Sequence, residues 1–317
     1  MYRREVALAG GGAIAIMLVT QLLALWLINP FESAGYQAVD DPGNPAYGAI
    51  FVLIILIATA GLLLALKYDL KRVIRGGIIL VAGLLSWYVF AAILPAPIVI
   101  ELGDVGLNPL PLLGVLAIVL GLVYHPEWYV IDLSAIIIGA GAIALFGISF
   151  SILPIIILLV VLAVYDAISV YGTKHMLTLA EGAMSMRLPV LLVIPLSLEF
   201  STLDIDERVE NEPTEEEATG MDAVFLGLGD IVIPSILIVS AAAHEVGPSL
   251  FSIGELAIGL PVIGGIFGSL LGLALLMMLV FRGAAHAGLP LLNGGVLLGY
   301  LLGALAVGVE LQSAVGL

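Results

Sequence analysis

The chain has 317 residues, of which 62% are hydrophobic and only 11% are charged, and its net charge at pH 7 is −15. Soluble proteins carry about 25% charged residues, so this composition excludes a soluble globular protein and predicts an integral membrane protein with several spans. The sequence has no cysteine, which excludes disulfides, thiolate metal ligands and a cysteine nucleophile, and it has no basic patch that would bind nucleic acid.

Apolar runs of about 20 residues, the length that crosses a bilayer as a helix, divide the chain into nine predicted spans. In chain order they cover residues 6–29, 47–66, 76–99, 109–124, 129–147, 150–172, 221–243, 254–281 and 288–309. We therefore predict an all-α polytopic membrane protein. Its N-terminal part, residues 1–172, holds the first six helices, and its C-terminal part, residues 221–317, holds the last three.

The positions of the basic residues test this count. With nine spans, all ten lysines and arginines fall on the side of the membrane that holds the N-terminus. Loops that carry Lys and Arg stay in the cytoplasm. We therefore expect a cytoplasmic N-terminus and an extracytoplasmic C-terminus.

The loop between the sixth and seventh spans, residues 173–220, has two different halves. Its apolar segment LPVLLVIPLSL, residues 188–198, is only 11 residues long and contains two prolines, so we predict an interfacial or re-entrant piece rather than a span. The stretch that follows, residues 199–222, has ten acidic residues and one basic residue. This pattern predicts a solvated, flexible loop, and a gate or a processing site is the alternative.

Two carboxylates lie away from the span ends. Asp166 is on the sixth span and Asp230 on the seventh, and burying such groups costs several kcal/mol, which makes them functional candidates. At 1.5 Å per residue, they lie roughly 12 and 13 Å from the same face of the membrane, so they can meet. The remaining carboxylates within or beside spans are near boundaries and are expected to reach the interface: Glu101, Asp104, Asp132, Glu255 and Glu310.

Two carboxyl groups in contact in a low-dielectric site share one proton, and this arrangement supplies a general base and a general acid. The base would take a proton from a water that attacks a peptide carbonyl, and the acid would protonate the leaving nitrogen. Gly227 and Gly229 would let a substrate backbone come close. The same carboxylates also suit a cation channel or a proton-coupled transporter, and their spacing and depth do not decide between the two classes.

The sequence around both aspartates resembles a known family. The YD of Tyr165–Asp166 and the GLGD of Gly227–Asp230 are similar to the two signatures of the GxGD intramembrane aspartyl proteases, the presenilin and signal peptide peptidase family. Their order on consecutive spans, the acidic loop between them and the nine predicted spans extend the resemblance over the whole chain. The cytoplasmic N-terminus and extracytoplasmic C-terminus match presenilin, and the short loops and absence of cysteine resemble a prokaryotic, archaeal member.

The resemblance implies a presenilin-like fold and hydrolysis of transmembrane-helix proteins or peptides within the bilayer, catalysed by Asp166 and Asp230. It implies neither a metal nor an organic cofactor. It is compatible with a homo-oligomer in a multi-pass arrangement in a prokaryotic cell membrane. The residues that would bind the substrate around the two signatures are Tyr165, Gly227, Leu228 and Gly229.

The family's third signature is Pro-Ala-Leu at the start of the last span, where this chain reads HAGLPLLNGG, residues 286–295. The match places Ala287, Gly288 and Leu289 in that role, followed by Pro290, with alanine in place of the first proline. A register on Pro290–Leu292 is the alternative. Because proline near a helix start leaves backbone groups unpaired, an extended substrate could pair with this segment as an added strand.

Other protease chemistries fit the sequence less well. His244–Glu245 begins like the zinc motif H-E-x-x-H, but Pro248 stands where the second histidine is required. The remaining histidines show no metal-ligand spacing, so no metal site is predicted.

Three glycines on the eighth predicted span, Gly264, Gly268 and Gly272, form a double G-x-x-x-G pattern. This pattern favours close approach of another helix. We expect the partner to be a helix of the same chain, with a dimer contact as the alternative.

Overall fold

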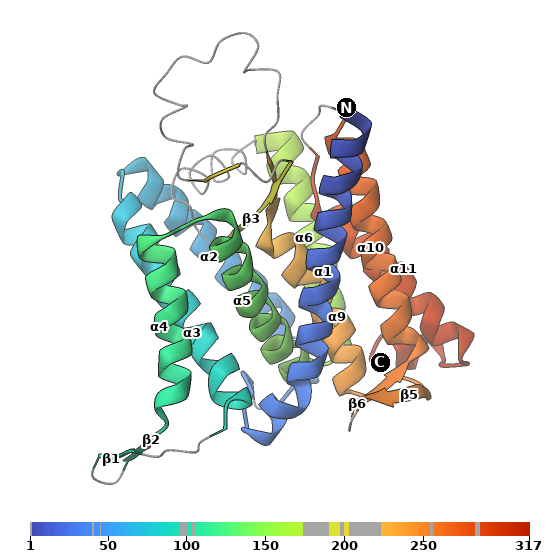
Figure 1. Cartoon of the computed structure of the whole chain (residues 1–317). Coiled ribbons are helices and arrows are strands. Elements are labelled where there is room, and N and C mark those ends of the chain that lie inside the picture. Colours follow the sequence, from blue (N-terminus) through green and yellow to red (C-terminus); the bar gives the residue numbers. More distant parts are fainter. Residues whose placement is uncertain are drawn as a thin grey trace.

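The computed structural model describes residues 2–39, 41–44, 46–95, 100–102, 105–173, 190–196, 200–202, 223–253, 256–282 and 286–317. Within these ranges the protein is mostly helical (Figure 1). The helices are α1 (Tyr2–Ser33), α2 (Ala46–Lys67), α3 (Lys71–Ile93), α4 (Pro109–Tyr124), α5 (Trp128–Ser149), α6 (Ile152–Ala167), the π-helix η1 (Ile168–Thr173), α9 (Leu228–Ala243), α10 (Leu260–Val280), α11 (Leu289–Ala306) and α12 (Leu311–Ala314).

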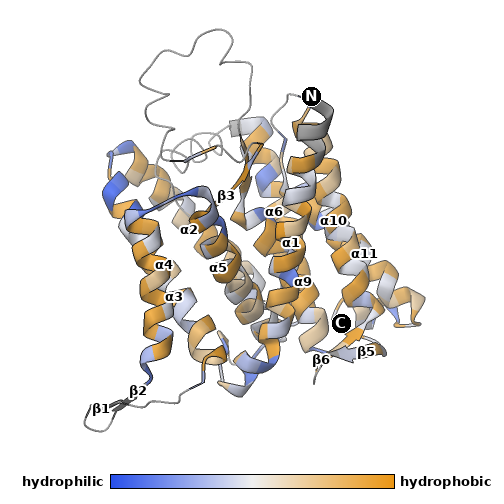
Figure 2. Ribbon diagram, viewed as in Figure 1, coloured by the Kyte–Doolittle hydropathy of each residue, from blue (hydrophilic) through white to orange (hydrophobic). Residues whose placement is uncertain are grey.

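Seven helices in the described ranges are long and apolar enough to cross a membrane: six formed by α1, α2, α3, α5, α10 and α11, and a seventh by α6 together with η1. Two shorter apolar helices, α4 and α9, occupy the positions of the fourth and seventh predicted spans. Most residues along the helices are hydrophobic (Figure 2). Leucines, isoleucines and valines along α2, α3 and α4 are exposed, as expected for side chains that face lipid.

Three small antiparallel sheets correct the prediction of an all-α protein. Strand β1 (Ile100–Leu102) pairs with β2 (Val105–Leu107), β3 (Leu191–Pro195) with β4 (Ala223–Gly227), and β5 (Ser249–Ile253) with β6 (Leu256–Gly259). The β3–β4 sheet lies at the end of the bundle that holds the N-terminus, and β5 and β6 lie at the opposite end (Figure 1).

The β3–β4 sheet changes two predicted segments. The seventh span was predicted to begin at residue 221, but residues 223–227 are strand and α9 begins only at Leu228. The described part of the segment 188–198 is strand β3, and its proline, Pro195, stands at the strand end, where a missing N–H is tolerated. The acidic stretch, apart from residues 200–202, lies outside the described residues.

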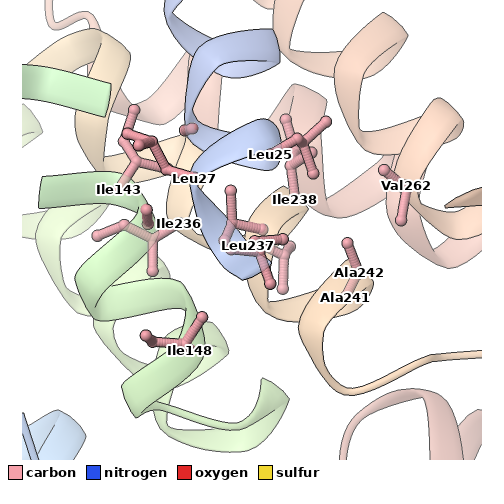
Figure 3. Close-up of a cluster of buried hydrophobic side chains, with 14 of the residues drawn as sticks. Leu25, Leu27, Ile143, Ile148, Ile236, Leu237, Ile238, Ala241, Ala242 and Val262 are labelled. Carbon is pink, nitrogen blue, oxygen red and sulfur yellow. The ribbon is translucent and has the colours of Figure 1, made fainter. Parts of the chain in front are cut away.

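Helix α9 lies at the centre of the bundle and packs against α1, α5, α6, α10 and α11. Every residue from Pro234 to Ala242 on this helix is buried. The core around it combines Leu25 and Leu27 from α1, Ile143 and Ile148 from α5, and Val262 from α10 (Figure 3). The helix that carries Asp230 is therefore enclosed on several sides by other helices.

The glycines of α10 pack against glycines of α11 from the same chain, which confirms the predicted internal contact. A Cβ atom at Gly264 would collide with the carbonyl oxygen of Gly299, and one at Gly268 with that of Gly295. The collisions are reciprocal, because a Cβ atom at Gly299 or Gly295 would meet the α10 carbonyls in turn. The two backbones thus touch directly, which requires residues without a side chain.

Candidate active site

Asp166 is the last residue but one of α6, and its side chain is only 5% exposed. Its Oδ2 accepts a hydrogen bond of 3.0 Å from the backbone N–H of Leu289, at the start of α11. The backbone amide of Gly288 interacts with the same carboxylate. Immediately after Asp166 the chain changes from α-helix to the π-helix η1, and such segments occur frequently at functional sites.

Asp230 lies in the first turn of α9, directly after strand β4. Its half-buried carboxylate is bordered by two glycines. A Cβ atom at Gly227 would lie 3.1 Å from Oδ2, and one at Gly288 would lie 3.0 Å from Oδ1. A side chain at either position would therefore crowd the carboxylate, which would have to shift by a few tenths of an ångström.

The two carboxyl groups meet at the peptide that joins Gly288 and Leu289. Asp166 binds the N–H of Leu289, and Asp230 lies against the α-carbon of Gly288. The two side chains are close enough for their charges to interact. Helices that are consecutive spans in the sequence thus bring together the two aspartates whose depths the sequence predicted to match.

The backbone of the third motif, Ala287–Leu289, lies between the two aspartates. Ala287, Gly288 and Leu289 are buried, and α11 begins at Leu289 with Pro290 in its first turn. The carbonyl oxygen of Gly288 accepts the N–H groups of Leu291 and Leu292, each at 3.2 Å. The register Ala287–Leu289 therefore lies beside the aspartates, whereas the alternative register, Pro290–Leu292, lies within the helix.

Other predicted site residues differ in their surroundings. Tyr165 is half-buried beside Asp166 in α6. The side chain of Leu228 packs towards α5, where a Cβ atom at Gly139 would lie 3.0 Å from its Cδ1. Gly229 is exposed, and a Cβ atom there would meet only Ile233, at 3.9 Å. A Cβ atom would thus crowd Asp230 from position 227, whereas position 229 has room for one.

Tyr171 belongs to the site although the sequence did not single it out. Its hydroxyl oxygen accepts a hydrogen bond of 3.3 Å from the backbone N–H of Ala287, two residues before the amide that binds Asp166. A spacing of five residues does not place two side chains on one face of an α-helix. The wider π-helical turn between Asp166 and Tyr171 brings both towards the third motif, and the 3.6-residue period gives no sign of it.

Asp132 corrects another expectation. It was expected to reach the interface, but its side chain is buried and its Oδ1 accepts a hydrogen bond of 2.8 Å from the backbone N–H of Val193 in β3. The sequence could not reveal this role, because the partner is a backbone group 61 residues away. Asp132 fixes β3 to α5.

This hydrogen bond also determines which edge of the small sheet is open. The N–H of Val193 points to Asp132 and away from β4. In an antiparallel pair of strands, two residues directly opposite each other either exchange backbone hydrogen bonds or both point their N–H and C=O groups away from the partner strand. Phe225 is opposite Val193, so its N–H and C=O groups point to the outer edge of β4. Among the described residues, none bonds these groups of Phe225. The open edge ends at Gly227, three residues before Asp230.

No three His, Asp or Glu side chains of the described residues form a group that could hold a metal ion.

Comparison with known proteins supports a single family. The sequence model described as "Signal-peptide peptidase, presenilin aspartyl protease" matches residues 14–309. A solved structure of a presenilin family intramembrane aspartate protease, in space group C222, is 34% identical, with a TM-score of 0.65 over 94% of this chain and 100% of that chain. A second, in space group P2, is 34% identical, with a TM-score of 0.62 over 93% of this chain and 97% of that chain. No curated protein matches the chain.

Proposed function

Because the chain belongs to the signal-peptide peptidase and presenilin family of aspartyl proteases, we propose that Asp166 and Asp230 are the two carboxyl groups with which it hydrolyses peptide bonds. The protein is an intramembrane aspartyl protease, as are the relatives of known structure. The observation that carries the residue assignment is the convergence of both carboxylates on the Gly288–Leu289 peptide. A cation channel or proton-coupled transporter has no support among the relatives.

In the proposed mechanism, one carboxylate takes a proton from a water molecule, whose oxygen attacks the scissile carbonyl carbon. The other carboxyl group gives its proton to the leaving nitrogen as the C–N bond breaks, so that one acid and one amine are released. Because Oδ2 of Asp166 accepts the N–H of Leu289, the other carboxyl oxygens of the pair are the more favourable positions for the shared proton. These are Oδ1 of Asp166 and the carboxyl oxygens of Asp230.

The proposed substrate is a transmembrane segment of another protein or peptide, which must become extended near the cleavage point to expose its backbone. At the outer edge of β4, the backbone groups of Phe225 have no partner among the described residues, and this edge ends three residues before Asp230. A substrate strand that pairs there would be delivered to the dyad by main-chain hydrogen bonds. The third motif, Ala287–Pro290, would border the substrate on the other side. Tyr165, Gly227, Leu228 and Gly229 complete the proposed substrate contacts.

The proposed topology has nine spans, a cytoplasmic N-terminus and an extracytoplasmic C-terminus. It combines the seven long candidate spans with α4 and α9. Residues 1–172 and 221–317 form the two membrane-embedded parts, joined by the cytoplasmic loop 173–220. A prokaryotic cell membrane and a homo-oligomer both stay predictions.

The assignment is tested with detergent-purified protein and a model peptide that spans a bilayer. Asp166→Asn and Asp230→Asn keep the size of each side chain and remove its acid–base capacity. We expect each variant to lose cleavage by a factor of at least about a hundred while its melting temperature stays close to that of the wild type. Cleavage at the wild-type rate by either variant would disprove the dyad. If neither variant cleaves and both also unfold at lower temperature, Asp166→Glu and Asp230→Glu separate loss of chemistry from loss of fold.

A further inference from the structure

Asn293 is a second link between the two helices that meet at the active site. It lies on α11, four residues after Leu289, and its side chain is only 1% exposed. Its Nδ2 donates a hydrogen bond of 2.8 Å to the backbone carbonyl oxygen of Leu159 on α6. Leu159 lies seven residues before Asp166 on the same helix and is buried.

Two hydrogen bonds thus join α11 to α6. One runs from the N–H of Leu289 to Asp166 and the other from Asn293 to Leu159. Along α11 the two attachment points are about 6 Å apart, and along α6 about 10 Å apart, at 1.5 Å per residue. The bonding atoms on α6 are closer together than the two residues, because the carbonyl of Leu159 points towards the C-terminus of α6 and the side chain of Asp166 tilts towards the N-terminus. The two separations can therefore match. Attachment at two heights fixes both the rotation of α11 and its position along α6.

The chemistry of Asn293 indicates that its donor is needed. Its Oδ1 is buried and has no hydrogen-bond partner among the described residues. An apolar side chain of similar size would fill the same space without leaving a buried acceptor unpaired, which is unfavourable. The carbonyl of Leu159 lies inside a helix and can be satisfied by that helix, so α6 does not require the bond either. What the bond adds is the connection between the two helices.

We propose that Asn293 is a positioning residue for peptide-bond cleavage, which locks α11 to α6 so that Gly288 and Leu289 keep both aspartates in register. The proposal rests on the proposed catalytic role of Asp166 and Asp230. When the link is removed, α11 can rotate or slide against α6. The N–H of Leu289 then leaves Oδ2 of Asp166, and Gly288 no longer holds the carboxylate of Asp230 in place. The edge of β4, which would supply the main-chain hydrogen bonds to the substrate, lies on other elements, so we expect the effect to fall mainly on kcat.

The first test is a comparison of Asn293→Leu with Tyr300→Phe. Tyr300 lies on the same helix, is equally buried, and donates from its hydroxyl group to the backbone carbonyl of Ala314 at 2.6 Å, away from α6. Each variant therefore loses one buried hydrogen bond to a backbone carbonyl. We expect Asn293→Leu to lower kcat at least tenfold with KM within twofold of wild type, and Tyr300→Phe to change neither by more than twofold.

Two results in this comparison would overturn the proposal. One is a wild-type kcat for Asn293→Leu. The other is a decrease of kcat in both variants that is proportional to the decrease of their melting temperatures. Asn293→Asp provides the conservative variant, because a protonated carboxyl group can still donate to the carbonyl of Leu159. We expect it to retain more activity than Asn293→Leu. Equal loss in the two variants would argue against a role of the donor.

The second test measures the position of α11 directly and does not depend on activity. The chain contains no cysteine, so Val160→Cys on α6 and Leu298→Cys on α11, at two exposed positions, can be spin-labelled selectively. We expect one narrow distance distribution in the otherwise wild-type protein and in Tyr300→Phe, and a broadened or shifted one in Asn293→Leu. An unchanged distribution in Asn293→Leu would refute the lock even if activity falls. If the distance distribution changes in Asn293→Leu but activity stays at the wild-type level, the position of α11 relative to α6 does not control cleavage, and the role proposed for Gly288 and Leu289 beside the aspartates is refuted.

Discussion

The α-carbon of Gly288 faces the carboxylate of Asp230 so closely that a Cβ atom would lie 3.0 Å from Oδ1 and 3.2 Å from Cγ. Gly288 stands at the second position of a motif that has alanine there in the family the chain resembles. In this chain the space beside Asp230 is too small for a methyl group unless the carboxylate or the start of α11 moves. The conformation of Asp230 is therefore tied to the absence of a side chain at residue 288.

Gly288→Ala should lower the cleavage rate by about ten- to a hundredfold, because small displacements of a catalytic group have effects of this size. The matched control is Gly294→Ala on the same helix, where a Cβ atom meets nothing within 4 Å. This control should keep its activity and gain stability, since alanine favours a helix over glycine by about 0.5–1 kcal/mol. Cleavage rates and melting temperatures of the two variants provide the comparison. If Gly288→Ala and Gly294→Ala are equally active, the carboxylate of Asp230 can move to accommodate the methyl group without a loss of cleavage rate.

The rate of cleavage should depend on pH with a bell shape, bounded by the two apparent pKa values of the aspartate pair. At low pH no carboxylate is free to act as the base, and at high pH no proton remains for the leaving nitrogen. The measurement is the initial rate on the model peptide across the pH range, at low and at high salt. A profile with a single limb that rises to a plateau at high pH would contradict a shared proton.

The outer edge of β4 should contribute to substrate binding through the N–H of Phe225. Phe225→Pro removes this donor, whereas the β3–β4 ladder uses the other edge of the strand. One backbone hydrogen bond contributes about 0.5–1.5 kcal/mol, so KM should rise about two- to tenfold. Phe225→Ala keeps the N–H and serves as the control. If Phe225→Ala raises KM as much as Phe225→Pro, the side chain and not the strand edge binds the substrate.

Glu127, in the turn before α5, should make stability depend on pH. Burial raises the pKa of Glu127, but hydrogen bonds from Ser201 and Thr202 and the nearby His125 outweigh it and hold the pKa below the ordinary value of 4.5. Because the folded-state pKa is lowered, the carboxylate stabilises the fold above pH 4.5, and this contribution is lost as the pH falls through the lowered pKa. The melting temperature of wild type should therefore fall more steeply than that of Glu127→Gln when the pH is reduced below about 4.5. Parallel curves for the two proteins would contradict the role of Glu127.

The proposed topology predicts which positions can be labelled from outside intact cells. Single cysteines at two exposed positions, Ser33 at the C-terminal end of α1 and Ser249 at the start of β5, should react with a membrane-impermeant thiol reagent. A cysteine at Thr214, in the acidic stretch, should react only after the cells are opened. Labelling of Thr214→Cys from outside would place the acidic stretch on the extracytoplasmic side and would require a different number of spans.

The sequence predicts the long helices well because each is a single apolar run with polar or glycine-containing ends. The turn HPEW, for example, separates α4 from α5 where predicted. The proximity of Asp166 and Asp230 was also predictable, since a carboxylate in an apolar run is conspicuous and helix rise gives its depth. The third motif was found only through its resemblance to a family, because its contribution is a backbone N–H and the lack of a side chain.

The sequence could not predict the β3–β4 sheet. The segments LLVIP and AVFLG are continuous apolar runs without alternation, so they are indistinguishable from the ends of spanning helices. Asp132 and Asn293 were missed for a related reason. Each bonds a backbone group that lies more than 60 residues away, at Val193 and Leu159, and backbone partners leave no mark on the sequence.

The glycine contacts between α10 and α11 have a mechanical consequence. Where two backbones touch without side chains between them, no rotamer change can absorb a displacement, so we expect α10 and α11 to move together. Gly288, beside Asp230, stands at the start of α11 and is expected to move with this pair of helices. A substrate segment that displaces α11 from α6 should therefore displace α10 as well.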